Sequence, residues 1–312
     1  MKVKERICLL LTVILCFASG MVALGDTEYK DLNPISILLP DEIPENLEGQ
    51  KHILLLCVDQ WNGKPENLGN TDGMLLLTLD GRSGRAMLTS FSRDMLVLRP
   101  DGKPGRITYI TKNSGPEALC QVISQHFGIQ VDQYILFDMK QVENIIQALG
   151  GVEITITGDE ADYLKRYPIN TDATTPQISG AGTYLFDGHS AVIYIRIRKV
   201  GGQGEMGRTE RMRRVLGTLA DRCRSITMAE ATALLGTISE NTMVTNLSLI
   251  EMLGWVDLAM QVKDGELEGI QMPVEGAYEG VTYAGMSVKQ VDFEMCRREL
   301  HDFLDGGFLV LD

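Results

Sequence analysis

The chain has 312 residues, of which 44% are hydrophobic and 23% charged, and its net charge is −13. These values are typical of a globular protein with a sizeable core, and the chain contains no low-complexity tract or internal repeat. The acidic balance argues against general nucleic-acid binding, because such binding needs a broad basic surface to neutralise phosphates.

The N-terminus, residues 1–25, has the pattern of a targeting segment. Three basic residues among the first six precede an uncharged run from Ile7 to Gly25. This pattern predicts either a secretory signal with a small-residue cleavage site at its end or an uncleaved membrane anchor. In both cases we expect the rest of the chain at the extracytoplasmic face of the cell membrane, or secreted if the segment is cleaved.

Residues 26–50 are rich in proline and acidic side chains, which predicts a linker. Beyond it, continuous apolar runs between turn residues predict strands at 52–59, 74–80, 85–92, 131–138, 152–157 and 191–198. Helical spacing of apolar residues predicts helices at 115–128, 139–151, 207–223, 228–238, 248–262 and 288–304.

Strands that alternate with helices and are apolar throughout indicate a sheet that helices cover on both faces. The predicted class is therefore α/β, a three-layer α/β/α sandwich with a mostly continuous central sheet and additional C-terminal helices. We expect the main domain at 51–225 and a helical extension at 226–312 that packs on the same domain. No two of the four cysteines beyond the N-terminal segment have the CxxC spacing of a metal or redox site: Cys57, Cys120, Cys223 and Cys296. They could form two disulfides, but we favour unpaired structural thiols.

A basic cluster interrupts the acidic chain between residues 193 and 216. This segment contains seven basic residues and only two acidic ones. The basic residues are Arg196, Arg198, Lys199, Arg208, Arg211, Arg213 and Arg214, and the acidic ones are Glu205 and Glu210. Alternation along the predicted strand places two of the arginines, 196 and 198, on one face. Helical spacing places another two, 208 and 211, side by side.

Such converging guanidinium groups favour a phosphate or diphosphate ligand, which arginine binds with two parallel hydrogen bonds. The alternative is a set of solvated surface charges, or of partners for some of the 42 acidic residues of the chain. We expect this alternative to hold for Arg213, which lies about 140° around the helix from Arg208 and would face water.

Three carboxylates stand at loop ends next to predicted strands: Asp59, Asp72 and Asp94. Carboxylates beside a diphosphate are the usual ligands of Mg²⁺, which needs only one or two of them. The alternative is turn and capping chemistry, for which aspartate is also common. In either case we expect Asp72 to lie near solvent.

Six segments resemble, in order, motifs of the LytR-CpsA-Psr family: LLLCVDQ, GNTDGMLLL, MLTSFSRDMLV, RITYI with GPEAL, YILFDMKQVENIIQALGGVEI and DGHSAVIYIRIRKVGGQGEMGRTERMRRVL. The resemblance spans about residues 50–225. It implies an extracytoplasmic enzyme with an α/β/α sandwich, which transfers glycopolymers from a polyprenyl-diphosphate carrier to peptidoglycan. The implied partners are that lipid-linked glycopolymer, peptidoglycan and the membrane, with no nucleic acid.

The resemblance also implies roles for individual residues. It assigns Asp59 and Asp72 to Mg²⁺ and Asp94 with Arg93 to catalysis. The diphosphate ligands that it implies are Arg93, Arg106, Arg196, Arg198, Arg208 and Arg211. The chain departs from the family pattern at Asn70, Gly73 and Met212, where an arginine, a hydroxyl and an amide are usual.

These departures keep two other functions open beside the transferase. One is a non-catalytic envelope protein that binds lipid diphosphates or wall polymer, and the other is a polyprenyl-diphosphate hydrolase with water as acceptor.

Overall fold

The structure, a computed structural model, describes residues 32–166, 176–197, 200, 204–223, 227–262, 265 and 267–306. It forms two compact units: the smaller unit draws on residues 1–48, 91–132 and 270–312, and the larger unit on residues 49–90 and 133–269. Neither unit ends near residue 225, where the sequence predicts a domain boundary. The predicted signal or anchor segment lies outside the described residues.

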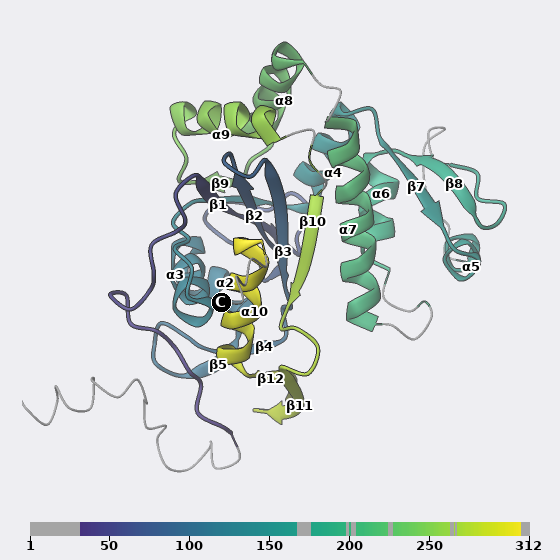
Figure 1. Cartoon of the computed structure of the whole chain (residues 1–312). Helices are drawn as coiled ribbons and strands as arrows, with labels where there is room; N and C mark the ends of the chain where they lie inside the picture. Colours follow the sequence, from purple (N-terminus) through teal and green to yellow (C-terminus); the bar gives the residue numbers. More distant parts are fainter. Residues whose placement is uncertain are drawn as a thin grey trace, which may run out of the picture. The chain divides into compact units, whose positions relative to one another are not determined.

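The larger unit is built on a six-stranded sheet in the order β10-β3-β2-β1-β6-β9. Its strands are β1 (Gln50–Val58), β2 (Thr71–Asp80), β3 (Arg85–Phe91), β6 (Tyr134–Phe137), β9 (Val244–Thr245) and β10 (Leu267–Met272). Figure 1 shows β1, β2 and β3 side by side. β1 runs antiparallel to β2 and parallel to β6, so that the hairpin predicted from the Asp80–Gly81 turn is confirmed as β2–β3.

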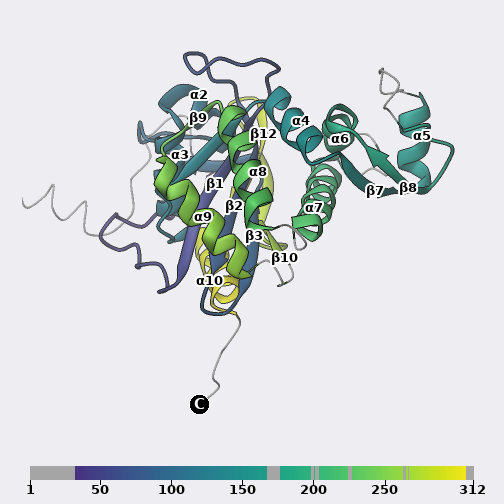
Figure 2. The ribbon, with the colours of Figure 1, turned by 90° about the horizontal axis from the view of Figure 1, so that it is seen from above.

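One face of this sheet is covered by two helices, α8 (Met228–Glu240) and α9 (Leu249–Val262). Ile53, Leu55 and Leu77 of the sheet pack there with Leu235 of α8 and Trp255 of α9. Figure 2 shows both helices lying across the strands. The helices predicted at 228–238 and 248–262 are therefore confirmed.

A second apolar cluster of the larger unit lies among α4 (Met139–Ala148), β7 (Val152–Ile156), α5 (Gly158–Arg166), β8 (Gly182–Phe186), α6 (Gly188–Ile195) and α7 (Gly204–Cys223). Its largest fully buried side chains are Phe186 and Tyr194. α4 begins with a capping box, in which Asp138 and Gln141 each accept a hydrogen bond from the other's backbone amide. Helix α4 is thereby fixed directly after β6.

In the described part of the chain, the smaller unit contains a four-stranded sheet in the order β11-β12-β4-β5, the 3-10 helix η1 (Ile107–Tyr109) and α-helices. These elements are β4 (Met95–Leu98), β5 (Pro104–Arg106), α2 (Ile110–Ser114), α3 (Pro116–Phe127), β11 (Tyr278–Tyr283), β12 (Met286–Val291) and α10 (Phe293–Asp305). The rings of Phe91, Phe127 and Phe293 form its aromatic core. Helix α3 ends at Gly128 in the left-handed conformation, as its sequence predicts. The region after residue 225 is not only helical, because it also contributes β9 to β12.

The strand predicted at 191–198 is wrong, because residues 188–195 form helix α6. Asp187 caps this helix by accepting a hydrogen bond from the Ser190 amide at 2.7 Å. Ala191, Val192 and Tyr194 are all buried, so that the run is apolar on more than one side and its period distinguishes poorly between strand and helix. Tertiary burial then outweighs the strand preference of the isoleucines.

Candidate functional site

Asp59 and Arg196 form an ion pair at the carboxyl end of β1, a central strand of the large sheet. Asp59 directly follows β1, and Arg196 is the residue at which α6 ends. The Arg196 Nη2 donates to Asp59 Oδ1 at 2.9 Å, and the two side chains are 36% and 40% exposed. The pair is therefore open to a ligand from solvent. Arg198 lies outside the described residues, so that its predicted position beside Arg196 stays a prediction.

Asp72 is the extra residue of a β-bulge. Cys57 of β1 pairs with Gly73 of β2, while the next residue, Val58, pairs with Thr71, so that Asp72 has no residue opposite it. Bulges of this kind redirect a side chain and occur next to active sites. The residue is only 5% exposed, which corrects the expectation that it lies near solvent. It is buried because the bulge holds it within the paired part of β2.

The lack of a side chain at Gly73, the residue after Asp72, is explained by the close approach of Cys57. A Cβ built on Gly73 would lie 3.1 Å from the Cβ of Cys57, closer than ordinary side chains approach. The hydroxyl residue that the family pattern has at this position is therefore disfavoured by the cysteine opposite it in this chain.

The loop that follows Asp59 carries two buried amide side chains, those of Gln60 and Asn70. The Asp59 amide donates to the Asn70 carbonyl at 3.0 Å, which joins the two ends of the loop 59–70. In the part of the chain that the structure describes, Gln60 Oε1 and Asn70 Oδ1 are buried acceptors without a hydrogen-bond donor. Buried acceptors of this kind normally have a donor or a cation as partner.

These oxygens fit a hard divalent cation. Among the described residues no group of three or more His, Cys, Asp or Glu side chains could hold a metal by itself. Mg²⁺ does not require one, since it is commonly held by one or two carboxylates and keeps several waters. The donor set of Asp59 and Asp72 with neighbouring amide oxygens is of this type.

The smaller unit holds a second set of predicted residues around Asp94. The Nε atoms of Arg93 and Arg106 lie 3.9 Å and 3.8 Å from Asp94 Oδ1, within ion-pair range but longer than a hydrogen bond. Arg106 also donates through Nη2 to the Ser287 carbonyl, while its buried Nε makes no hydrogen bond among the described residues. The structure thus brings these three predicted residues together.

Arg211 lies in a buried ionic network rather than at a surface. Its Nε donates to Glu160 Oε1 at 2.7 Å and its Nη1 to the Ile197 carbonyl at 2.9 Å, and its side chain is 3% exposed. Arg214 and the Tyr194 hydroxyl contact the same carboxylate at 3.2 Å. Arg211 therefore has a carboxylate of the protein itself as its partner, while its predicted placement beside Arg208 stays a prediction, because the Arg208 side chain lies outside the described residues. The Arg211 guanidinium joins α7 to α5 and α6 because helix α7 turns this side toward the core.

The network shifts the pKa of its members. Burial on its own raises the pKa of Glu160, but the Thr157 amide and the cations Arg214 and Arg211 outweigh it and hold the pKa below its ordinary value. Burial and the adjacent carboxylate of Glu160 raise the pKa of Tyr194. Glu160 was not predicted as functional, although the capping-box pattern of Thr157 and Glu160 at the start of α5 is visible in the sequence.

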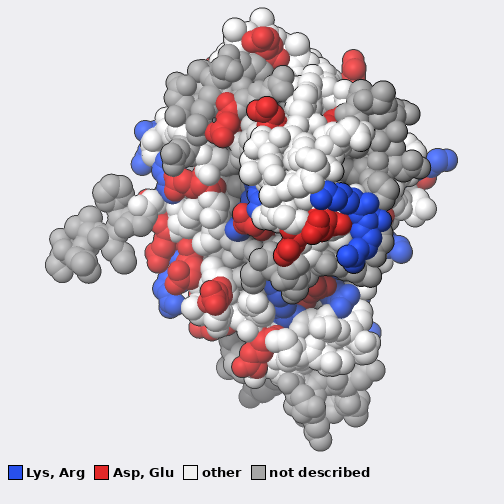
Figure 3. Space-filling view, turned by 90° about the vertical axis from the view of Figure 1, so that its right-hand side faces the viewer, with Lys and Arg blue, Asp and Glu red and all other residues white. Residues whose placement is uncertain are grey.

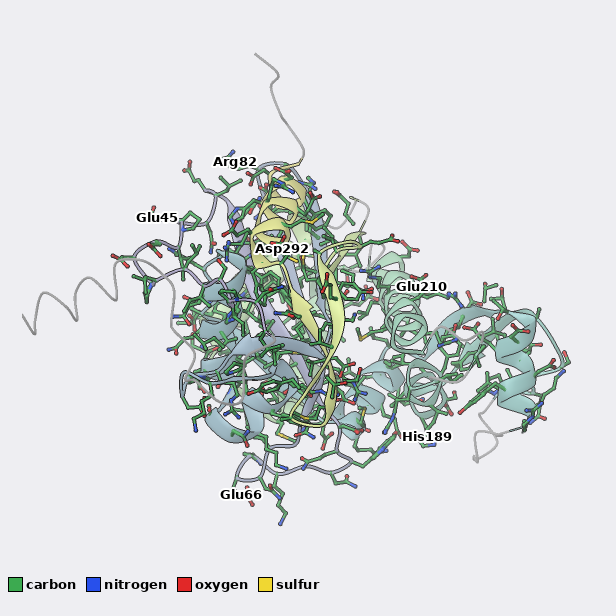
Figure 4. All side chains as sticks on the ribbon, turned by 90° about the horizontal axis from the view of Figure 1, so that it is seen from below. Glu45, Glu66, Arg82, His189, Glu210 and Asp292 are labelled. Atoms are coloured by element: carbon green, nitrogen blue, oxygen red, sulfur yellow. The ribbon has the colours of Figure 1, made fainter. Side chains whose placement is uncertain are left out.

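Arg213 is partly buried against the sheet, which corrects the prediction that it simply faces water. Its Nη2 donates to Ser90 Oγ on β3 at 3.1 Å, and burial lowers its pKa. The Nε atom is buried and has no partner in the described part of the chain. Helix α7 also carries Glu210 on its exposed side, as labelled in Figure 4. The side chain of Arg208 lies outside the described residues, so that its role stays a prediction.

The face drawn in Figure 3 shows acidic and basic groups next to one another among the coloured residues. The described arginines of the basic cluster differ in their partners. Arg211 and Arg214 neutralise a buried carboxylate, Arg196 pairs with Asp59, and Arg213 contacts a hydroxyl.

A family model covers most of the chain. The LytR_cpsA_psr family model matches residues 27–299. Biofilm regulatory protein A of Streptococcus mutans is 25% identical over 178 residues, which cover 54% of this chain and 42% of that protein. The polyisoprenyl-teichoic acid–peptidoglycan teichoic acid transferase TagU of Bacillus licheniformis is 23% identical over 168 residues, which cover 53% of this chain and 51% of that protein.

A solved structure supports the fold. TagT, described as a LytR-CPS2A-psr family protein with bound octaprenyl pyrophosphate lipid, matches with a TM-score of 0.61 at 21% identity, covering 83% of this chain and 91% of that one. The predicted α/β class is thereby confirmed. The chain spans about half the length of the curated relatives that it matches.

Proposed function

The chain belongs to the LytR-CpsA-Psr family, as its ordered motifs predicted, and from this premise we propose that it is an extracytoplasmic phosphotransferase. It would move a glycopolymer from a polyprenyl-diphosphate carrier to peptidoglycan. Relatives with transferase names and a family structure with bound octaprenyl pyrophosphate support this substrate class.

The observation that carries the proposal is the Asp59–Arg196 ion pair at the end of β1, next to the strand β2 that contains the β-bulge at Asp72. The Arg196 guanidinium of this pair is solvent-accessible. Among the described residues, the buried oxygens Gln60 Oε1 and Asn70 Oδ1 in the same loop region have no donor. The Arg196 guanidinium can bind a phosphate group. The carboxylate and amide oxygens are suited to a divalent cation that accompanies the phosphate. A site that combines both preferences fits a diphosphate better than a neutral ligand.

The proposed reaction exchanges one phosphorus–oxygen bond for another. A hydroxyl oxygen of the acceptor glycan attacks the phosphorus next to the sugar, and the bond from this phosphorus to the bridging oxygen breaks. The electron pair stays on the departing polyprenyl phosphate. Arg196 binds the diphosphate oxygens and offsets the growing charge. No nucleotide is needed, because the diphosphate bond is already activated.

The remaining roles belong to the same proposal. The attacking hydroxyl gives up its proton to a general base. The resemblance implies Asp94 for this role, and within the smaller unit Arg93 and Arg106 lie within ion-pair range of the Asp94 carboxylate. Mg²⁺, held by Asp59 and Asp72, would supply further charge neutralisation on the diphosphate when bound. Asp59 therefore has two tasks, since it also holds Arg196 in place.

Purified protein incubated with a polyprenyl-diphosphate sugar, Mg²⁺ and peptidoglycan fragments tests the function. Transfer of labelled sugar phosphate to the fragments supports the transferase. Binding without turnover would show a non-catalytic envelope protein, and release of sugar phosphate into water would show a hydrolase.

Replacing Arg196 by alanine is expected to weaken binding of a polyprenyl diphosphate by about 10- to 100-fold, because one charge-assisted contact is lost. Isothermal titration measures the effect. Arg99→Ala provides the control, since Arg99 contacts an exposed carboxylate, Asp101, in the smaller unit. Equal affinities of the Arg196→Ala variant and the wild type would remove Arg196 from the site.

We also propose that the protein is held at the outer face of the cytoplasmic membrane by residues 1–25. The basic start and the uncharged run that follows it support this location. Among the residues that the structure describes, no helix has the length and apolar character needed to span a bilayer. Protease added to intact protoplasts should degrade the protein, and full protection would contradict the proposal.

A further inference from the structure

An exposed tryptophan lies in the loop that follows β1. Trp61 is 38% exposed, and its indole packs against the imidazole of His189 on α6 (labelled in Figure 4), with the ring centroids 5.7 Å apart and the planes tilted by 47°. The His189 side chain is 39% exposed as well. Single apolar side chains are common on protein surfaces, so that exposure alone assigns no role to Trp61. Its surroundings indicate one.

The loop holds Trp61 in a fixed position. The carbonyl of the preceding residue, Gln60, accepts from the first amide of α4 at 2.9 Å, and the Gly63 amide donates to the capping residue Asp138 at 2.7 Å. Between these two ties the chain turns at Asn62, whose φ of 54° is a left-handed conformation that asparagine tolerates better than most residues. An aromatic side chain presented in this way loses little conformational freedom when a ligand binds.

Polar groups adjoin the His189 ring. Glu143 on α4 accepts from His189 Nδ1 at 3.2 Å and from Lys140 Nζ at 2.8 Å. Since a carboxylate only accepts, the ring proton lies on Nδ1, and Nε2 of the neutral imidazole is an acceptor. The Lys140 side chain is 44% exposed and has three N–H donors, of which the carboxylate uses one. An acceptor, donors and an exposed aromatic ring therefore occur together.

Helix α6 connects these groups with the Asp59–Arg196 ion pair. His189 and Arg196 are seven residues apart on this helix, which places them within about 20° of each other around it and about 10 Å apart along its axis. Asp59 and Trp61 are two residues apart in one loop. The same loop thus contacts the same side of α6 twice, once at the exposed cation and once, about two turns earlier, at the two rings.

This combination of groups is suited to a sugar ring. A pyranose has a face of C–H groups, whose partial positive charge packs on the negative face of an aromatic ring, and it has hydroxyls at its edge that both donate and accept. His189 Nε2 and Lys140 Nζ offer the complementary acceptor and donors. Because the charges of Lys140 and Glu143 offset each other, the site is suited to a neutral sugar, in contrast to the cationic Arg196.

We infer that Trp61, His189 and Lys140 form a subsite for a sugar ring of one of the two glycans that the reaction brings together, the carried polymer or the acceptor. The inference rests on the proposed function, since that function places the diphosphate at Arg196. The separation of about two helical turns exceeds the length of one sugar ring, so that the subsite does not hold the sugar attached directly to the diphosphate. Stacking contacts the C–H face of the ring, so that pyranoses with different edges can bind.

Isothermal titration with three ligands tests the inference: geranyl diphosphate, geranyl diphosphate linked to an N-acetylglucosamine disaccharide, and a soluble peptidoglycan disaccharide. We expect Trp61→Ala to weaken binding of at least one disaccharide ligand by about 3- to 10-fold, the effect of one aromatic contact, and to leave the affinity for geranyl diphosphate unchanged. Trp61→Phe keeps a ring and should keep most of the affinity. A loss with the lipid-linked disaccharide assigns the subsite to the carried glycan, and a loss with the peptidoglycan disaccharide assigns it to the acceptor.

His189→Phe provides a second variant outside the loop. It keeps a ring beside Trp61 but removes the hydrogen-bonding nitrogen atoms, and it should weaken the same ligand by a similar factor. If Trp61→Ala fails to fold, this variant decides the matter. Ile250→Ala on α9 is the control, since it removes another exposed apolar side chain of the same unit, 82% exposed, and should leave all three affinities unchanged.

Unchanged binding of both disaccharide ligands in the folded variants would overturn the inference and leave the proposed function standing. An equal loss of affinity for geranyl diphosphate would do the same, because Trp61 would then act on the lipid diphosphate and not on a sugar. A wild type that gains no affinity from the lipid-linked disaccharide and does not bind the peptidoglycan disaccharide would also overturn the inference alone. Failure of the wild type to bind geranyl diphosphate would overturn the proposed function together with the inference.

Discussion

Replacing Glu160 by glutamine is expected to lower the free energy of unfolding by about 3–5 kcal/mol, the range found when one partner of a buried ion pair is removed. The carboxylate is 4% exposed and contacts two guanidinium groups and a tyrosine hydroxyl. Glutamine keeps the shape but leaves the cations of Arg211 and Arg214 without a counter-charge. Urea unfolding followed by circular dichroism measures the change.

Asp162→Asn on the same helix is the control, because this carboxylate is 73% exposed and pairs only with Lys165 among the described residues. Surface pairs of that kind contribute at most about 1 kcal/mol. A Glu160→Gln variant as stable as Asp162→Asn would show that the network does not hold α5, α6 and α7 together.

The stability that Glu160 contributes is expected to decrease as the pH falls. The pKa of Glu160 in the folded protein lies below its ordinary value of 4.5. Its stabilising contribution is therefore fully present above pH 4.5 and is lost as the pH falls through the folded value. The Glu160→Gln variant should lose less stability than the wild type between pH 5 and pH 3, a range of about two units around the ordinary value.

Replacing Asp72 by asparagine is expected to lower the transfer rate by about 100-fold or more, comparable to removing one preorganised electrostatic contact to a transition state. Asparagine is chosen because Asp72 is buried in the bulge, where a smaller residue would leave a cavity. The variant should also need a higher Mg²⁺ concentration for half-maximal activity. Product formation measured over a Mg²⁺ titration tests both effects.

Asp257→Asn on α9 serves as the control, since its carboxylate accepts from Gln261 on the surface of the same unit. An Asp72→Asn variant with the wild-type rate and Mg²⁺ requirement would move the metal site away from β2. An unchanged thermal unfolding temperature would show that any loss of rate does not come from unfolding.

The sequence predicts the elements whose ends are marked by side chains. Helix α3 lies between two glycines that adopt positive φ angles, Gly115 and Gly128, and the β2–β3 hairpin follows from the turn after Asp80. Helix α6 could not be recognised from its period, because its buried positions surround the helix. The strands β10 to β12 have weak alternation, so that only their pairing identifies them.

For the candidate site, the sequence predicts the identity of residues better than their partners. The ion pair of Asp59 with Arg196 joins positions 137 residues apart, and no local pattern indicates it. The opposite environments of Arg211 and Arg213 depend on what lies on each side of α7, namely a buried glutamate or a strand. Helical spacing gives the angle between two side chains but not the neighbour that each one meets.

The bulge at Asp72 has a consequence for changes in chain length. Residues 71 and 73 would share a face in a regular strand, but here they pair with Val58 and Cys57, which point to opposite faces. Deleting residue 72 alone would therefore restore regular alternation and leave the side chains of β2 from Gly73 onward on their present faces. Deleting one residue between Leu75 and Leu79 would instead turn one part of the strand over and expose its buried leucines. The position that carries the proposed metal ligand is thus one that the sheet can lose without losing its core.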